Sequence, residues 1–415
     1  MNPLTVLAIE TSCDETAIAL MRINTNEHDS PIFSVLGNTV ASQIALHQEY
    51  GGVFPAMAKR EHAKNIPQVL LDTLTQAGFI EKTESQEITP AQKEKIEKIL
   101  EREEGLTDFF INTLSTVTKP AIDAIAVTYG PGLEPALWVG ISFAKALSIL
   151  WDIPLVPVNH MEGHALSILV QESAESKNDV WKKYSTAEIA FPSIALLISG
   201  GHTELVLIKD IGEYTVIGKT RDDAVGEAFD KVARMLGLPY PGGPEISKYA
   251  AIAREKTTEQ EDKIILPRPM LHSGDFDFSF SGIKTSVLYK LRDERAANPE
   301  KEFVLSDERI QEYARAFEDA ITDVLVSKTL RAVEVHGAHS LIVGGGVAAN
   351  TFIRKTLTEK IETDSLNIQT YFPEKEVATD NAIMIGIVSY FNILAEKIVS
   401  PNNVDSVRAN GNLEL

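Results

Sequence analysis

The chain has 415 residues, of which 44% are hydrophobic and 24% charged, the balance of a globular protein with a buried core. This length exceeds what one core ordinarily holds, so we expect two domains. The net charge of −20 at pH 7 argues against non-specific binding to nucleic acid, and the single cysteine, Cys13, excludes an internal disulfide.

The sequence shows no targeting or membrane signal. Acidic residues begin at Glu10 without a basic leader before them, and no apolar run approaches the length of a membrane span. We therefore expect a cytoplasmic protein that uses no membrane. If it handles RNA, the charge predicts that it does so through a local basic patch or a basic partner.

The first predicted element is a hairpin over residues 6–20, with a tight turn at 11–15. The same pattern recurs over 194–208, around the turn Ser199–His202. Two such strand-turn-strand patterns suggest two copies of one α/β domain, each beginning with this pattern. In such a pair, each turn can offer backbone amides to a phosphate. Two ordinary hairpins are the alternative. This alternative is weaker for the second turn, because its paired glycines let the backbone approach a ligand closely.

Residues 59–77 are predicted to form a helix that carries a small basic cluster, Lys59, Arg60 and Lys64. Such a cluster is more often a solvated helix face than a binding site. A strand over 122–127 follows later, and it leads through a glycine-proline turn into a helix that reaches Leu150.

Two polar stretches interrupt this pattern. Residues 81–105 are rich in charge, with Ile96, Leu100 and Leu106 at helical spacing, which predicts an inserted surface helix. Residues 171–188 are also polar and indicate an excursion between the domains.

The segment Val158–Ala165 holds a pair of histidines. Asn159 is a good helix N-cap, and a helix that begins there places His160 and His164 on one face. Two imidazoles so placed can bind one metal ion, although a spacing of four also arises by chance. Glu162 does not directly follow the first histidine, so the pattern differs from that of zinc peptidases.

A glycine run, Gly344–Gly346, follows a buried strand over 341–343 and precedes a helix. A strand, a glycine loop and a helix N-terminus together favour an anion or nucleotide site over a merely crowded turn. Further on, Asp380 opens the last long helix. It is either a helix cap or the carboxylate that completes two histidines on a metal.

Seven motifs stand in the order known from one family. They are Glu10–Thr16, His160–His164, Ser199–Thr203, Gly226–Lys231, Tyr240–Pro244, Asp277–Thr285 and Gly345–Asn350. The chain resembles the TsaD family of bacterial tRNA threonylcarbamoyladenosine transferases. The resemblance covers nearly everything except the inserts at about 81–118 and 171–188.

The resemblance implies an α/β fold of two actin-like (ASKHA, acetate-kinase/Hsp70 type) domains around a nucleotide cleft. We expect domain I over residues 1–160, with a helical insert at about 81–118 and a C-terminal helix at about 380–400 that packs back on it. Domain II is then expected over 161–379. The implied enzyme is an acyltransferase. It moves a threonylcarbamoyl group from threonylcarbamoyl-AMP to the exocyclic amine of the adenosine 3′ of the anticodon, in tRNAs that read ANN codons.

The resemblance also implies the site residues. One divalent metal ion per subunit, iron or zinc, is expected on His160, His164 and Asp380. Substrate-binding positions are expected at Leu197, Ile198, Ser199, Gly200, Gly201, Asp230, Gly243 and Asn350. The chemistry itself needs a proton acceptor for the attacking amine, and the acids of the first turn, Asp14 and Glu15, are candidates for this catalytic role.

The implied partners are the tRNA substrate, threonylcarbamoyl-AMP, a TsaB-like paralogue, a TsaE-like ATPase and a TsaC-type enzyme that supplies the adenylate. The chain departs from the family at two positions near the expected site. Ala56 replaces a common glutamate, and Ser247 stands where many relatives have an aspartate that contacts substrate.

Three other classes of protein remain as alternatives. An actin-like kinase or ATPase needs magnesium-binding carboxylates and has no use for the histidine pair. A metallopeptidase is disfavoured by the position of Glu162. A non-catalytic partner subunit of the same fold is disfavoured because all three metal-ligand positions are filled.

Overall fold

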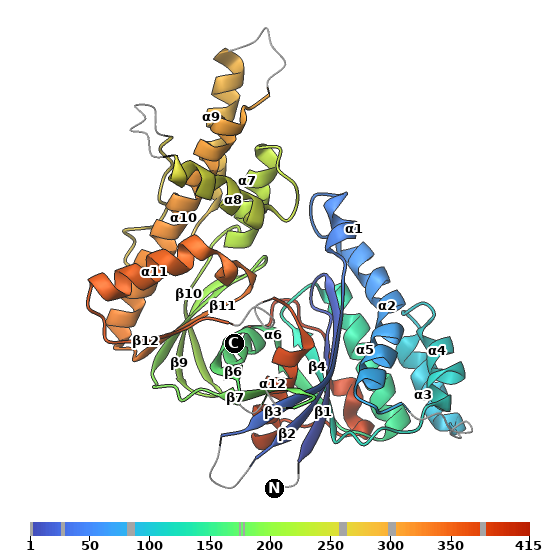
Figure 1. Cartoon of the computed structure of the whole chain (residues 1–415). Helices are drawn as coiled ribbons and strands as arrows, with labels where there is room; N and C mark the ends of the chain where they lie inside the picture. Colours follow the sequence, from blue (N-terminus) through green and yellow to red (C-terminus); the bar gives the residue numbers. More distant parts are fainter. Residues whose placement is uncertain are drawn as a thin grey trace. The chain divides into compact units, whose positions relative to one another are not determined.

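The computed structural model describes residues 3–25, 30–80, 88–173, 176, 179–256, 264–297, 304–373 and 379–415. The chain divides into two compact units, whose elements are labelled in Figure 1. Unit 1 contains Met1–His47, Val53–Glu188 and Thr379–Leu415, and unit 2 contains Gln48–Gly52 and Ile189–Ala378.

The boundary after Glu188 lies later than the one expected at residue 160. The stretch 171–188, expected as an excursion between domains, instead contributes to the strands β6 (Val170–Glu172) and β7 (Lys182–Thr186), which extend the first sheet. Pairing of β7 with β3 through backbone hydrogen bonds keeps this stretch in unit 1.

Unit 1 is built on a seven-stranded sheet with the order β5-β4-β1-β2-β3-β7-β6. The other strands span β1 (Leu4–Glu10), β2 (Glu15–Asn24), β3 (Ile32–Ser42), β4 (Ala124–Gly130) and β5 (Leu155–Asn159). Strands β1, β4 and β5 are parallel, whereas β1-β2-β3-β7-β6 are joined by antiparallel pairs. The carboxyl ends of the three parallel strands therefore meet at one edge of the sheet, the usual place for a ligand in an α/β unit.

Helices cover both faces of this sheet. They span α1 (Ile44–Gln48), α2 (Pro55–Gln76), α3 (Pro90–Leu100), α4 (Leu106–Asn112), η1 (Leu114–Thr116), α5 (Glu134–Trp151), α6 (His160–Leu166), η2 (Ser167–Leu169), α12 (Ala382–Leu394) and η6 (Pro401–Ser406). In β1, Leu7 and Ile9 join the core that includes residues of α2 and α5, whereas Ala8 lies against Gly386 of α12. A strand buried on both faces needs no polar alternation, which explains the unbroken apolar run of β1.

Within the described residues 88–118, the insert between α2 and β4 forms α3, α4 and the short η1, and α3 lies in the stretch 81–105 that was expected as a surface helix. The chain turns between α3 and α4, and Gly105, with a φ of 80°, precedes α4. The predicted apolar positions Ile96, Leu100 and Leu106 are buried and join the core of unit 1. Residues 81–87, where the insert was expected to begin, lie outside the described residues.

Unit 2 is built on a five-stranded sheet with the order β10-β9-β8-β11-β12. Its elements span β8 (Ser193–Ile198), β9 (Thr203–Asp210), β10 (Glu213–Lys219), α7 (Val225–Met235), α8 (Gly242–Glu255), α9 (Ser281–Ala297), α10 (Asp307–His336), β11 (Ser340–Gly344), η4 (Gly346–Ala349), α11 (Thr351–Thr363) and β12 (Gln369–Tyr371). Strands β8, β9 and β10 are antiparallel neighbours, and β8, β11 and β12 are parallel.

The two sheets share one plan. The order and the orientations of β10-β9-β8-β11-β12 repeat those of β3-β2-β1-β4-β5 in unit 1. The predicted fold class is therefore confirmed: the chain is α/β and consists of two actin-like (ASKHA) units. Within the described ranges, no helix combines the length and the apolar character needed to cross a membrane.

Candidate functional site

The histidine pair lies on α6, directly after β5. As predicted, Asn159 caps this helix, and its side chain accepts hydrogen bonds from the amides of Met161 at 2.8 Å and Glu162 at 3.3 Å. The rings of His160 and His164 lie on the same face of the helix, with their centroids 4.6 Å apart, and both residues are buried. The sequence thus positions two imidazoles at the carboxyl edge of the parallel strands.

Asp380 faces these imidazoles from the segment that precedes α12. Its Oδ1 lies 3.5 Å from Nε2 of His160 and 3.1 Å from Nε2 of His164. The cap of α12 is the neighbouring Asn381, whose side chain accepts from the amide of Met384 at 3.0 Å. Asp380 is therefore not the helix cap, and the alternative in which it contributes to a metal site is the one that the geometry favours.

The three side chains fit a metal ion. One ligand atom from each of His160, His164 and Asp380 can be chosen so that all lie within 4.8 Å of one another. The Nε2 atom of His164 is buried and makes no hydrogen bond to any residue that the structure describes. Its 3.1 Å contact with Asp380 has the distance but not the angles of a hydrogen bond. Two imidazole nitrogens and a carboxylate oxygen are donors suited to iron or zinc.

A fourth residue, Glu10, holds His160 from the other side. Its Oε2 lies 3.1 Å from Nδ1 of His160 and accepts from the hydroxyl of Thr128 at 2.5 Å, and its Oε1 accepts from the amide of Ser12 at 2.5 Å. Glu10 is fully buried at the end of β1. A carboxylate on Nδ1 fixes the ring so that Nε2 points toward Asp380, an arrangement typical of metal-bound histidines.

The charges of this cluster stabilise one another. Burial disfavours the charged form of His160, but the carboxylates of Glu10 and Asp380 outweigh it and raise the pKa of His160 well above its usual value. Burial likewise opposes ionisation of the two acids, yet His160 holds the pKa of Glu10 below and that of Asp380 well below their ordinary values. The site is thus built for a cation between two carboxylates, and a metal bound there would replace a proton.

The first turn carries two acidic residues, Asp14 and Glu15, and the surroundings of Glu15 raise its pKa. Burial, followed by the charges of Asp14 and Asp380, raises the pKa of Glu15 to about 10. At neutral pH Glu15 is therefore a neutral carboxylic acid, which donates rather than accepts a proton. This protonation disfavours Glu15 as the proton acceptor that the sequence suggests.

In unit 2, the expected substrate turn Leu197–Gly201 closes the β8–β9 hairpin. Leu197 and Ile198 are fully buried at the end of β8, so the structure exposes neither residue of this expected pair to a ligand. The turn packs against two glycines: a Cβ on Gly226 would lie 2.6 Å from the carbonyl oxygen of Ser199, and one on Gly345 would meet that of Ile198. The start of α7 and the glycine run thus support the turn.

Two further expected positions lie near the start of α8. Asp230, on α7, accepts a hydrogen bond from the amide of Gly242 at 2.7 Å. Gly243 follows in the first turn of α8, with open space where a Cβ would stand. The structure thus brings Asp230 and Gly243 together within unit 2.

Asn350 caps α11 directly after η4. Its Oδ1 accepts from the amides of Phe352 and Ile353, and its Nδ2 donates to Ser247 and Glu318. Sequence reasoning missed Glu10 and Glu318. Glu10 stands in a recognised motif at a strand end, which is a usable signal, whereas nothing in the local sequence marks Glu318.

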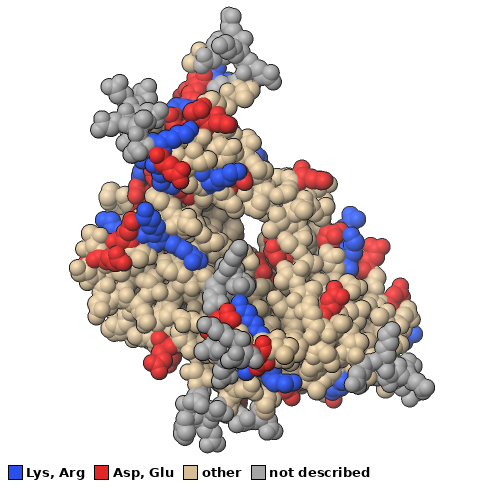
Figure 2. Space-filling view, in the orientation of Figure 1, with Lys and Arg blue, Asp and Glu red and all other residues tan. Residues whose placement is uncertain are grey.

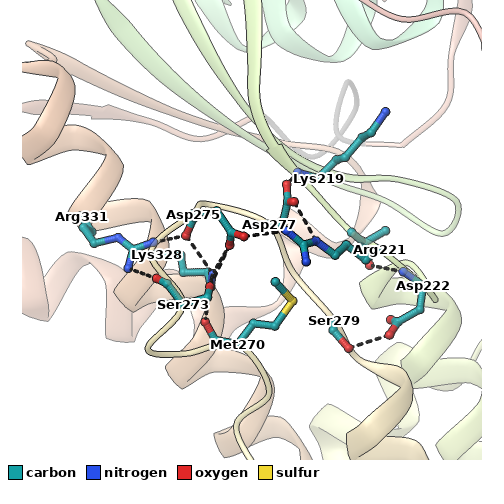
Figure 3. A network of polar contacts seen from close by, with 11 residues as sticks. Lys219, Arg221, Asp222, Met270, Ser273, Asp275, Asp277, Ser279, Lys328 and Arg331 are labelled. Atoms are coloured by element: carbon teal, nitrogen blue, oxygen red, sulfur yellow. Dashed lines mark hydrogen bonds and ion pairs between the residues drawn. The ribbon is translucent and has the colours of Figure 1, made fainter.

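The motif Asp277–Thr285 is held by a network of charged residues, shown in Figure 3. Asp222 accepts from the hydroxyls of Ser279 and Ser281 at 2.6 Å each, and from the amide of Phe280 at 2.8 Å. Arg221 pairs with Asp275 at 2.6 Å and with Asp277 at 2.9 Å. This motif therefore fastens the loop before α9 to the segment before α7.

The comparisons with known proteins agree on one family. The family model described as "TsaD: tRNA N6-adenosine threonylcarbamoyltransferase" matches residues 34–89 and 104–387. The protein of that name from Polynucleobacter asymbioticus is 40% identical over 395 residues, which cover 94% of this chain and 93% of the relative. Its counterpart from Ralstonia pickettii is 38% identical over 391 residues, 94% of this chain and 92% of the relative.

Among solved structures, full-length HypF in its phosphate- and nucleotide-bound form is similar to this chain at 13% identity and a TM-score of 0.48, over 95% of this chain and 56% of that one. A likeness this distant carries no information on function. The family match and the near full-length relatives do, and this chain belongs to the TsaD family of tRNA N6-adenosine threonylcarbamoyltransferases.

Proposed function

We propose that this chain transfers the threonylcarbamoyl group of threonylcarbamoyl-AMP to tRNA. The acceptor is the exocyclic amine of the adenosine 3′ of the anticodon, in tRNAs that read ANN codons, and AMP is released. The observation that carries the proposal is the cluster of the buried His160 and His164 with the half-buried Asp380, in a chain whose near full-length relatives are named for this transfer.

The reaction makes a difficult demand on the protein. The amine nitrogen attacks the carbamoyl carbon, the bond from that carbon to the phosphate oxygen breaks, and the amine loses a proton. An adenine amine is a poor nucleophile because its lone pair is delocalised into the ring. The protein must therefore hold the two reactants in line and stabilise the charge that develops on the carbonyl and phosphate oxygens.

In this proposal, His160, His164 and Asp380 hold one iron or zinc ion. Such an ion supplies Lewis acidity toward an oxygen of the donor. Glu10 holds the imidazole of His160 in place through Nδ1 at 3.1 Å. Asp14, buried in the turn after β1, is the proposed acceptor of the amine proton.

The adenylate is proposed to bind unit 2. The main chain of Gly200 and Gly201, together with Asp230 and Gly243, supplies hydrogen-bonding groups beside helix starts, whereas the amide and the carbonyl of Ser199 already pair with His202 and Gly226. Backbone amides at such positions suit a phosphate, because they carry partial positive charge and no side chain blocks them.

The partners proposed are those of the family: a TsaB-like paralogue, a TsaE-like ATPase and a TsaC-type enzyme that makes the adenylate, acting in the cytoplasm. The net charge of −20 supports a need for partner proteins, because a chain of this charge repels tRNA, which is a polyanion. On the face seen in Figure 2, the basic residues lie among acidic ones rather than in one broad patch.

The test is a reconstitution with threonine, bicarbonate, ATP, unmodified tRNA and the partner proteins, followed by mass analysis of the nucleosides. We expect threonylcarbamoyladenosine, and none when guanosine replaces the acceptor adenosine of the tRNA. His164→Ala should lower the yield by at least about 10–100-fold, which is typical of a disturbed metal site. His336→Ala, a change of the same kind outside both sites, serves as the control. Full transfer by a folded His164→Ala variant would overturn the role proposed for the metal site, and absence of the modified nucleoside from the wild-type reaction would overturn the proposed transfer.

A further inference from the structure

The tail, residues 408–415, lies along the carboxyl ends of β4 and β5. The amide of Asn410 donates to the carbonyl of Tyr129 at 2.9 Å, and the carbonyl of Gly411 accepts from the amide of Gly132 at 3.2 Å. This is the edge of the first sheet at which α6 begins with its two histidines. The tail therefore belongs to the surroundings of the candidate metal site, although it supplies none of the three expected ligands.

Glycines let the tail pack against this edge, main chain against main chain. A Cβ on Gly130 would collide with the carbonyl oxygen of Asn410 and lie 3.0 Å from Cβ of Leu413, and Gly130 has a φ of 154° that other residues rarely adopt. A Cβ on Gly411 would lie 2.9 Å from the carbonyl oxygen of Gly132. The tail thus fits a place that the turn after β4 leaves open for it.

The tail reaches the metal site first through Asn159, the cap of α6. The side-chain oxygen of Asn159 accepts from the amides of Met161 and Glu162, and its nitrogen donates to the carbonyl of Glu414 at 3.1 Å. Two N–H donors can face only the oxygen, so these contacts fix which way the side-chain amide is turned. A main-chain carbonyl of the tail therefore holds the residue that directly precedes His160.

A second route runs through the turn after β4 to Ser12. The amide of Leu133 donates to the carbonyl oxygen of Ser12 at 2.8 Å, and a Cβ on Gly132 would lie 2.7 Å from the same oxygen. Oγ of Ser12 lies 3.2 Å from Nδ1 of His160. The turn that pairs with the tail at Gly411 thus also packs against a residue that touches the imidazole.

We propose that the tail is a positioning segment of the metal site, whose seating on β4 and β5 holds Asn159 and Ser12 beside His160. This inference rests on the proposed metal site. The tail acts through main-chain groups of Asn410, Gly411 and Glu414, so its side chains give no signal of this role in the sequence.

The proposal requires that metal binding and tail seating strengthen each other. If the metal binds more tightly when the tail is seated, the bound metal must stabilise the seated tail by the same factor. One net hydrogen bond between Asn159 and Glu414 corresponds to a factor of about three to ten. A tail that only completes the fold would show no such reciprocity.

The first experiment measures this reciprocity in the wild-type chain, with zinc as the probe. Hydrogen exchange at the amides of Asn410 and Leu413, both bonded within this region, reports opening of the tail. We expect saturating zinc to slow their exchange by about three- to tenfold. The amide of Asp123, which donates to Thr5 at the opposite end of the strands, is the control for a general stabilisation of unit 1.

The second experiment breaks the contact from each side and measures zinc affinity by competition with a chelator. A chain that stops at Leu413 lacks the carbonyl of Glu414, and Asn159→Ser keeps a good helix cap but removes the donor. We expect each change to weaken zinc binding by about three- to tenfold, and the two together to weaken it no more than either alone. Asn412→Ala, a change at an exposed side chain of the tail, should leave zinc affinity unchanged.

The outcomes distinguish this inference from the metal site on which it rests. Zinc that binds without slowing exchange of the tail amides would overturn the inference alone. Wild-type affinity in the chain that stops at Leu413, or losses that multiply in the double variant, would also overturn it. If the shortened chain does not fold, exchange in the wild-type chain decides. Absence of zinc binding by the wild-type chain would overturn the proposed metal site, and this inference with it.

Discussion

Glu10 and His160 are 150 residues apart in the sequence, and yet Oε2 of Glu10 lies 3.1 Å from Nδ1 of His160. The carboxylate of Glu10 accepts from three donors, the imidazole, the hydroxyl of Thr128 and the amide of Ser12. Any change that turns a donor toward this group disturbs the orientation of the imidazole. Glu10 would not touch a bound metal, yet its contact with His160 predicts that a change of Glu10 weakens metal binding.

Glu10→Gln keeps the size of the side chain but replaces one acceptor oxygen with a donor. We expect the affinity for zinc or iron to fall by about 10–100-fold, as is typical when a partner of a ligating histidine is changed. Competition with a chelator and elemental analysis measure this without any assay of transfer. Glu318→Gln, another fully buried carboxylate but in unit 2, should leave metal affinity unchanged. Equal retention of metal by wild type and Glu10→Gln would contradict the role given to Glu10.

The raised pKa of Glu15 predicts how stability depends on pH. With a pKa near 10 in the folded protein and an ordinary value of 4.5 when unfolded, Glu15 binds more protons in the folded state throughout that range. Stability should therefore fall as pH rises from about 5 to about 9. Glu15→Gln removes this contribution, so thermal unfolding of the metal-free variant should depend less steeply on pH. A wild-type pH profile that the variant reproduces would show that Glu15 ionises normally.

Gly226→Ala should displace the turn after β8. The new Cβ would lie 2.6 Å from the carbonyl oxygen of Ser199 and 2.7 Å from Cα of Gly200, both of them main-chain atoms. We expect a loss of about 1–3 kcal/mol in stability, as for other overpacked sites, together with weaker AMP binding. Calorimetry and thermal unfolding measure the two effects. Gly274→Ala, where nothing lies within 4 Å of the added Cβ, is the matched control and should change neither.

We propose that the basic cluster on α2, Lys59, Arg60 and Lys64, is the tRNA contact of unit 1, but its members differ in their ion pairs. Lys59 lies 3.4 Å from the buried carboxylate of Glu103, and Lys64 lies 3.4 Å from Glu61. Reversal of Lys59 would thus disturb the fold, so exposed Arg60 is the better probe. Arg60→Glu should weaken tRNA binding by the partner-containing complex and lower its salt dependence, by a log–log slope of about 0.7–0.9 for each phosphate that is no longer neutralised.

Filter binding of tRNA over a range of salt concentrations measures this slope. Lys355→Glu, an equal change of charge on α11 of unit 2, is the control. AMP affinity should be unaffected by Arg60→Glu. A salt slope that stays unchanged would remove α2 from the tRNA-binding surface.

Local sequence was sufficient for part of this architecture. The cap at Asn159 and the shared face of His160 and His164 follow from contacts within one helical turn. The buried positions Ile96 and Leu100 followed from helical spacing in the same way. Such features depend on neighbours three or four residues away, which a sequence displays directly.

The remaining site features depend on how distant segments meet. Glu10 reaches Thr128 and His160 only because β1, β4 and β5 are parallel neighbours. Glu318 sits in the middle of a long helix, and its contact with Asn350 exists only once α10 lies beside α11. The raised pKa of Glu15 arises from burial, then from the charges of its neighbour Asp14 and of the distant Asp380, and its own strand reveals neither the burial nor the contact with Asp380.

The return of the chain at Thr379 has a consequence for the order of events during synthesis. Asp380 reaches His160 and His164 through α12, whose Gly386 allows close packing on Ala8 and Met21 of the first sheet. A ribosome releases the chain from its N-terminus, so both histidines emerge long before this carboxylate does. The three-ligand site is thus completed only when nearly the whole polypeptide has been made, and a product cut short before Thr379 would carry the two histidines without their carboxylate.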